Sequence, residues 1–186
     1  TPVAAKVFIY PIKKRETEIL PFFEDLRIAM DMQLSIDTIV VRLFLAIVLA
    51  MLIGWERENQ DKPAGLRTHM LVGLGSAAFF LIFIEFALGP LKEAEGISPD
   101  PTRVFQGVVT GIGFLGAGAI IQGSGNVKGL TTGAGIWVAG GIGLACGGGY
   151  FVIATIVTLF TLLILAVVGR VEKIFSSSDG DGSKNE

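Results

Sequence analysis

The stretches GWERE at 54–58 and GVVTGIGFLGAG at 107–118 decide the fold of this chain. The first, continued by KPAGLRTH at 62–69, places charges, a proline and a glycine between two apolar runs, each long enough to cross a bilayer. The second is apolar, yet it carries more glycine than an ordinary soluble helix tolerates. Together they predict a multi-pass membrane protein whose helices approach one another closely at glycine.

The composition supports lipid as the surrounding medium. Of 186 residues, 51% are hydrophobic and only 17% are charged, and the mean hydropathy is +0.65. A soluble domain usually carries about a quarter charged residues. The formal net charge of -2 offers no basic surface, so we expect no nucleic-acid partner. The single cysteine, Cys146, excludes a disulfide within this sequence.

The chain divides into a membrane domain and two flanking segments. We expect five spans of about 20 residues, at 36–54, 66–88, 104–122, 129–147 and 150–169, which form an all-α, polytopic membrane helix bundle. Residues 1–35 form an N-terminal extension, whose part 21–35 has the spacing of an amphipathic helix that lies on the membrane or docks on the protein. Residues 170–186 are predicted to be a disordered polar tail.

Basic residues near the span ends predict the orientation. One side of the bundle collects Arg57, Lys62, Arg67, Lys128, Arg170 and Lys173, and the other collects Arg27, Arg42, Lys92 and Arg103. The positive-inside rule therefore places the first loop and the C-terminus in the cytoplasm and the N-terminus outside.

Two charges are expected inside the membrane, near its outer face. Arg42 lies in the first span and Glu85 in the second, at depths that differ by about one helical turn, ~5 Å. An unpaired charge in hydrocarbon costs at least about 2.5 kcal/mol. We expect the two to pair, the alternative being that each reaches the outer interface separately.

The loop between the first two spans is the main candidate site. Its motif comprises Glu56, Arg57, Glu58, Lys62, Pro63, Gly65, Arg67, Thr68 and His69. One interpretation is a salt-bridged cap in which Glu56 reaches Arg67, with His69 as a hydrogen-bonded structural residue. The other is a cytoplasmic docking or sensing site, in which His69 responds to pH.

The loop has features both for and against a metal site. Glu56, Glu58 and Asp61 supply three carboxylates, the oxygen ligands that Mg²⁺ requires. The neighbouring Arg57, Lys62 and Arg67 neutralise them.

Glycines in the third and fourth spans predict close helix contacts. The candidates are Gly107, Gly111, Gly113, Gly116, Gly118, Gly129 and Gly133. Such spacing lets a neighbouring backbone approach. A broken helix that lines a polar path is the alternative, with Gln106, Thr110, Gln122, Asn126, Thr131 and Thr132 as its lining. Because no acidic residue lies deep in the last three spans, helix contact is favoured.

The sequence predicts neither an enzyme nor a cofactor. It contains one histidine and no metalloprotease or phosphate-loop signature.

Three blocks resemble the MgtC/SapB family of bacterial inner-membrane proteins. They are GWERENQDKPAGLRTHMLVGLGSA at 54–77, DPTRVFQGVVTGIGFLGAGAII at 100–121 and VKGLTTGAGIW at 127–137. The resemblance extends from about 43 to 168. It carries over Glu56, Arg57, Lys62, Pro63, Gly65, Arg67, Thr68, His69, Asp100, Arg103, Gly113, Gly116, Gly118, Gly129 and Thr131 as motif positions; Asp100 and Arg103 form an outer loop motif.

The resemblance implies a five-span domain linked to growth under magnesium limitation and to survival of pathogens in macrophages. It also implies a regulator that acts on the F-type ATP synthase. Two departures from the family matter. The last expected span is followed here by a polar tail where longer members have a soluble domain, so we expect the shorter SapB-like form, and Gln122 stands where a basic residue is common.

Two hypotheses about function follow. The first is a non-enzymatic regulator that binds a membrane-protein partner, or further copies of itself, through its spans and the 56–69 loop. The second is a small transporter or channel for Mg²⁺ or another cation.

Overall fold

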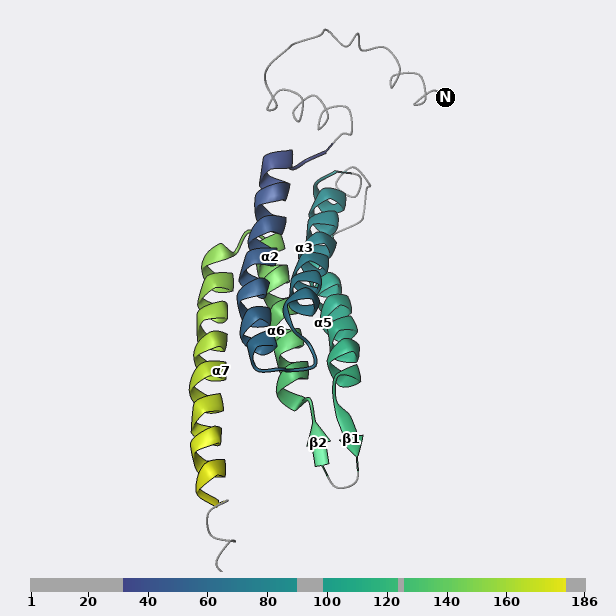
Figure 1. The fold of residues 1–186 in the computed structure, drawn as a ribbon. Helices are drawn as coiled ribbons and strands as arrows, with labels where there is room; N and C mark the ends of the chain where they lie inside the picture. Colours follow the sequence, from purple (N-terminus) through teal and green to yellow (C-terminus); the bar gives the residue numbers. More distant parts are fainter. Residues whose placement is uncertain (1–31, 90–98, 124–125, 180–186) are drawn as a thin grey trace, which may run out of the picture.

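The protein is a bundle of long helices, seen here in a computed structural model (Figure 1). The structure describes residues 32–89, 99–123 and 126–179, so the extension at 1–31 lies outside the described ranges. Within them it contains α2 (Ile36–Asn59), α3 (Leu66–Leu88), α5 (Pro101–Gly118), α6 (Leu130–Gly147) and α7 (Phe151–Asp179). A short hairpin of β1 (Ile121–Gly123) and β2 (Asn126–Lys128) joins α5 to α6. The predicted all-α membrane bundle is confirmed.

Helix α6 forms the centre of the bundle and contacts each of the other four helices. In its most apolar part 61% of the residues are buried, against 17% in α2 and 28% in α3. Glycines on α6 let the neighbouring helix α3 approach it closely. A side chain at Gly143 would collide with the carbonyl oxygen of Gly73 on α3, and one at Gly147 would lie 2.7 Å from that of Ala77.

Three of the described helices, α2, α3 and α6, are long and apolar enough to cross a membrane by themselves. Helix α3 has the expected bounds, whereas α2 continues past Gly54 to Asn59. Helix α5 ends at Gly118 rather than at 122, and the hairpin that follows was not expected. Its register pairs Ile121 with Lys128 and Gly123 with Asn126.

The connections to α6 depend on positive backbone φ angles. Gly129, with φ of 89°, begins α6 where a Cβ atom would collide with the carbonyl oxygen of Ala119. Gly149, with φ of 83°, ends α6 in a Schellman motif. In that motif Tyr150 N–H donates to Ala145 O at 2.8 Å. Chain reversal by the glycines at 147–149 follows from this geometry.

The last helix is longer than the sequence indicates. It continues to Asp179, so the disordered tail predicted from residue 170 begins too early. Residues 171–175, VEKIF, carry no helix-breaking residue, and the small polar run starts only at Ser176. Residues 180–186 lie outside the described ranges.

Candidate functional site

The end of α2 is closed by a Schellman motif that fixes the candidate loop. Lys62 N–H donates to Arg57 O at 3.1 Å, and Asp61 N–H donates to Glu58 O at 3.0 Å. Asp61 occupies the left-handed position with φ of 53°. Glycine is the usual residue at this position, because it has no Cβ to strain the backbone.

The Glu58 side chain caps the N-terminus of the next helix, α3. Its carboxylate Oε2 accepts from Leu66 N–H at 2.8 Å, in the first turn of α3. The N-cap residue Gly65 has no side chain for this task. A carboxylate there satisfies a free N–H and complements the helix dipole. Gly54 lets the loop lie on α2, since a Cβ at Gly54 would be 2.8 Å from the Leu66 Cα.

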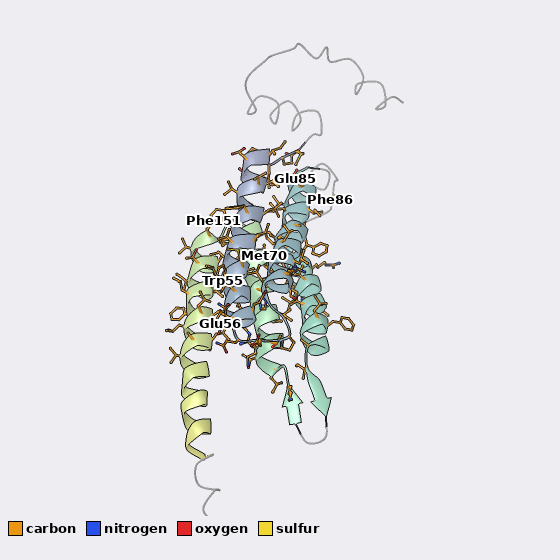
Figure 2. All side chains as sticks on the ribbon, in the orientation of Figure 1. Trp55, Glu56, Met70, Glu85, Phe86 and Phe151 are labelled. Carbon is orange, nitrogen blue, oxygen red and sulfur yellow. The ribbon has the colours of Figure 1, made fainter. Side chains whose placement is uncertain are left out.

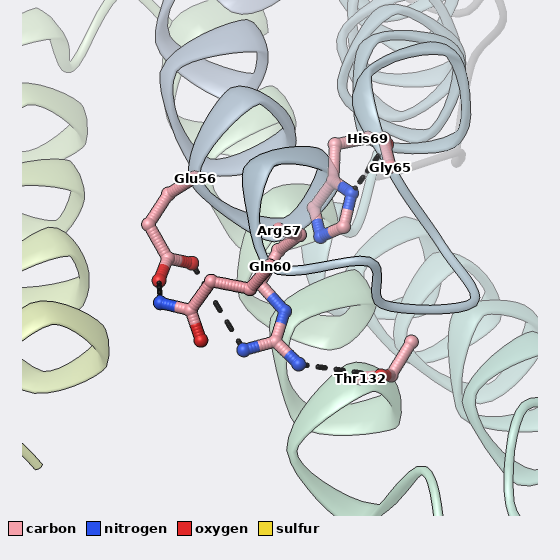
Figure 3. Close-up of polar contacts among 6 residues, drawn as sticks. All are labelled: Glu56, Arg57, Gln60, Gly65, His69 and Thr132. Carbon is pink, nitrogen blue, oxygen red and sulfur yellow. Dashed lines mark hydrogen bonds and ion pairs between the residues drawn. The ribbon is translucent and has the colours of Figure 1, made fainter. Parts of the chain in front are cut away.

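His69 is fully buried in the first turns of α3. Its Nδ1 lies 2.9 Å from Gly65 O (Figure 3). Because a carbonyl only accepts, Nδ1 carries the hydrogen, and in a neutral ring Nε2 keeps a lone pair. Nε2 faces α6, where a Cβ on Gly135 would lie 3.2 Å away.

Arg57 lies beneath this ring, with only 4% of its surface exposed. Its Nη2 donates to Thr132 Oγ1 on α6 at 3.4 Å, and its Nη1 lies 3.9 Å from Glu56 Oε2. Gln60 donates to the other carboxylate oxygen of Glu56 (Figure 3). Glu56, Arg57, His69 and Thr132 thus form one polar cluster, drawn from α2, α3 and α6, which we call the inner polar cluster.

Three buried polar atoms of the inner polar cluster have no hydrogen-bond partner. They are Glu56 Oε2, Arg57 Nε and His69 Nε2. Leaving such groups dry costs about 1–3 kcal/mol each. The set offers one donor and two acceptors when the ring is neutral, which suits an ordered water molecule. With one carboxylate facing a guanidinium, the site carries little net charge.

The rest of the loop motif does not join this cluster. Lys62, Pro63, Arg67 and Thr68 are exposed. Within the described ranges Arg67 forms no ion pair, so the predicted Glu56–Arg67 bridge is wrong. Glu56 pairs instead with Arg57, which follows it in α2 and turns inward.

The three carboxylates that could have formed a metal site are dispersed. Among the described residues no group of three or more His, Cys, Asp or Glu side chains is placed to hold a metal ion. Glu56 belongs to the polar cluster and Glu58 caps α3.

The predicted pair of Arg42 and Glu85 is also wrong. Arg42 Nη1 donates to Gly147 O at 2.8 Å, at the end of α6. Glu85 accepts from the backbone N–H groups of Gln33 and Leu34, both at 2.8 Å. Each charge is therefore satisfied by nearby backbone groups, which lie closer than the opposite side chain.

The outer loop motif caps α5. Asp100 Oδ1 accepts from Thr102 Oγ1 at 2.6 Å and from Thr102 N–H at 2.9 Å. These two hydrogen bonds hold the pKa of the exposed Asp100 carboxyl below its usual range. Arg103 adds a smaller electrostatic effect in the same direction.

Only some of the glycines predicted to pack between helices lie at a contact between two helix backbones. A Cβ on Gly116 would be 3.2 Å from Gly133 O, and one on Gly133 would be 2.8 Å from Gly116 O. No neighbour lies within 4 Å of a Cβ on Gly107, Gly111, Gly113 or Gly118, so their predicted role in contacts within this chain is wrong. At 100° per residue, Gly107, Gly111 and Gly118 lie about 140–180° around α5 from Gly116, whereas Gly113 lies about 60° from it, beside the contact with α6.

An apolar groove separates α3 from α5. The groove has a volume of about 910 Å³. Its lining includes Phe79, Phe83 and Phe86 on α3, and Gly107 and Gly111 on α5. Phe86 is labelled in Figure 2. These two glycines expose the backbone of α5 to the groove.

The sequence predicts neither the bond between Thr132 and Arg57 nor the packing of Gly135 beside the His69 ring. The spacing of Thr132, Gly135 and Ile136 on one face of α6 was the available signal.

The fold and its apolar spans define a multi-pass helical membrane protein. A family model described as the MgtC family matches residues 43–174. The chain is 41% identical over 128 residues to "Putative magnesium transporter YhiD" of Escherichia coli, covering 69% of this chain and 59% of that protein. The chain belongs to the MgtC family.

Two other relatives match a similar share of this chain. "Protein SrpB" of Synechococcus elongatus is 39% identical over 72% of this chain and 76% of its own length. "Protein MgtC" of Salmonella typhimurium is 38% identical over 76% of this chain and 59% of its own length. The chain thus spans about three fifths of the length of YhiD and MgtC. No solved structure matches it.

Proposed function

We propose that this chain is a non-enzymatic regulator of the bacterial inner membrane that acts under magnesium limitation by binding another membrane complex. Membership of the MgtC family and the printed name of the YhiD relative support the link to magnesium. The F-type ATP synthase is our candidate complex, because the resemblance to the MgtC/SapB family implies it.

The α3–α5 groove carries this proposal. It is apolar, opens at the side of the bundle and exposes backbone at Gly107 and Gly111. In a bilayer, helices associate through close backbone approach rather than through a hydrophobic driving force. The groove therefore fits one transmembrane helix of the partner complex.

The orientation belongs to the same proposal. The C-terminal end of α2, the β-hairpin and the N-terminal end of α6 lie at one end of the bundle (Figure 1). This end carries Arg57, Lys62, Arg67 and Lys128. By the positive-inside rule it faces the cytoplasm, with the N-terminal end of α2 outside.

The test is co-reconstitution with purified F-type ATP synthase in vesicles. We expect the wild-type chain to change proton-driven ATP synthesis by about fivefold or more, the lower end of ordinary coupling. Gly111→Leu adds a side chain to the groove, at a position where a Cβ has no neighbour within 4 Å, and should abolish the change. The matched Gly118→Leu, at a glycine that does not line the groove, should keep it. Equal ATP synthesis with and without the wild-type chain would refute the candidate complex.

A second candidate is magnesium transport, which the printed name of the YhiD relative favours. Vesicles that contain only this protein and a magnesium-sensitive dye test it directly. Magnesium entry that depends on the protein and is lost in Thr132→Val would favour transport, because Thr132 belongs to the inner polar cluster. Absence of entry under an imposed gradient would remove this candidate.

A further inference from the structure

The His69 ring fills the junction of α2, α3 and α6. It belongs to α3 and is fully buried. Glycines let the other two helices lie against it: a Cβ on Gly54 of α2 would be 3.1 Å from His69 Cβ, and one on Gly135 of α6 would be 3.2 Å from His69 Nε2. Movement of this ring would therefore disturb the packing of all three helices.

The ring uses only one of its two nitrogens in this packing. Nδ1 donates to Gly65 O, whereas Nε2 has no hydrogen-bond partner among the described residues (Figure 3). A proton bound at Nε2 would turn this acceptor into a donor and would place a cation in the junction. A cation that is withdrawn from water is costly unless it is paired. The observed packing therefore fits the neutral ring and not the charged one.

The charges around the ring do not pair with a second cation. The charged side chains near it are Glu56, Arg57 and Glu58 on α2 and Arg67 on α3, whereas α6 carries none. Arg57 opposes a positive charge on the ring and Glu56 favours one, but Glu56 already faces Arg57. Glu58 caps α3 and Arg67 is exposed. The inner polar cluster is thus balanced with a neutral ring and gains one net positive charge with a protonated ring.

We propose that the inner polar cluster is a pH-sensitive switch. A proton on His69 Nε2 shifts the protein to an open state, in which water enters the cluster and the beginning of α3 separates from α6. Opening also breaks the hydrogen bond from Arg57 to Thr132, which crosses the same junction. The exposed loop residues Lys62 and Arg67 then move relative to α6, so a buried residue controls the surface that the loop presents.

The sign of the pH dependence follows from proton binding. In the open state the ring is hydrated and titrates near pH 6.5, as histidine does in water. The closed state binds no proton at Nε2, so its stability relative to the open state falls as the pH drops below about 6.5. One proton bound on opening increases the ratio of open to closed protein by up to about tenfold for each pH unit.

Nuclear magnetic resonance tests the protonation step. The chain contains one histidine, so labelling histidine with ¹⁵N reports on His69 alone. In bilayer discs, where both membrane faces meet the same buffer, we expect a neutral ring with its hydrogen on Nδ1 at about pH 7.5 and a charged ring at about pH 5. A ring that stays neutral down to about pH 5 would overturn the proposal.

Spin labels test whether the proton opens the junction. In a Cys146→Ala background, Lys62→Cys in the loop and Leu130→Cys at the start of α6 place labels at exposed positions. Their separation should lengthen or broaden between about pH 7.5 and about pH 5, together with protonation of the ring. His69→Asn is the matched control, because its amide N–H can donate to Gly65 O but binds no proton in this range. Constant separations while the wild-type ring titrates, or an equal change in His69→Asn, would refute the switch.

A second pair of variants keeps the test decisive if His69→Asn does not fold. Thr132→Val removes the acceptor of Arg57 across the junction, so opening should begin about 0.5–1 pH unit higher, the shift that a three- to tenfold weaker closed state produces. Thr131→Val, on the exposed side of α6, should leave the pH of opening unchanged. Equal midpoints in the two variants would contradict a switch at this junction.

The switch does not rest on the proposed function. It is measured on the purified chain with no partner present, whereas the proposed function is decided by ATP synthesis and the variants of the α3–α5 groove. Failure of one proposal therefore leaves the other to be decided by its own experiment.

Discussion

The contact between α3 and α6 at Gly143 gives the sharpest prediction about stability. A Cβ at this position would collide with the backbone oxygen of Gly73 and would lie 2.8 Å from Ser76 Cβ. The nearest obstacle is backbone, so no flexible side chain can move aside. We expect Gly143→Ala to force the two helices apart.

The magnitude follows from how far they must separate. Ordinary contact begins at 3.4 Å, so the Ser76 Cβ has to retreat by about 0.6 Å and the nearer Gly73 carbonyl oxygen by more. A gap of about that size forfeits a quarter to a half of the dispersion energy at neighbouring contacts. Overpacking of this kind costs about 1–3 kcal/mol, from which the better helix propensity of alanine subtracts up to about 1 kcal/mol.

Gly141→Ala is the matched control. Gly141 is exposed on α6, and a Cβ there meets nothing within 4 Å. It should stabilise the protein by up to about 1 kcal/mol, through propensity alone. The assay is reversible unfolding in mixed micelles, followed by helical circular dichroism. The free energy of unfolding of Gly143→Ala should be lower than that of Gly141→Ala by about 1–3 kcal/mol. Equal stability of the two variants would refute the close contact.

Three further predictions concern the ends and interior of the helices. Asp61→Gly should stabilise the protein by about 0.5–1 kcal/mol in the same unfolding assay, because it relieves a left-handed backbone; a loss of stability would contradict this. Thr132→Val should destabilise it by about 1 kcal/mol, because Arg57 loses an acceptor, while Thr131→Val on the exposed side of α6 should have no effect. Because the folded-state pKa of Asp100 is lowered, its contribution to stability should be constant above about pH 5 and be lost as the pH falls below about 4. Thermal unfolding across this range checks the last point: stability should fall less in Asp100→Asn than in the wild type, and an equal fall in both would contradict it.

The burial of the inner polar cluster bears on how the loop could act. In the interpretation of the loop as a docking or sensing site, His69 would face a cytoplasmic partner, yet both Arg57 and His69 are buried and Arg57 bonds to α6. A partner that binds this loop would instead contact the exposed residues Lys62, Pro63, Arg67 and Thr68. The buried cluster then holds the exposed residues in place.

The sequence by itself determined the membrane location, the bounds of α3 and nearly those of α6, and the identity of the central motif. Run length and composition suffice for these, because each span is a local property of about 20 residues in hydrocarbon. The three consecutive glycines at 147–149 also indicate a tight turn from the sequence alone, because positive φ is a local requirement that glycine meets.

Only the tertiary structure decided which side chains meet. The partners of Arg42 and Glu85 are backbone groups, and no spacing rule specifies these. Gly111 and Gly116 look equivalent in sequence, but only Gly116 lies against α6. The physical reason is that contacts depend on how each helix is rotated about its axis, and the described helices settle that rotation together as four of them pack around α6.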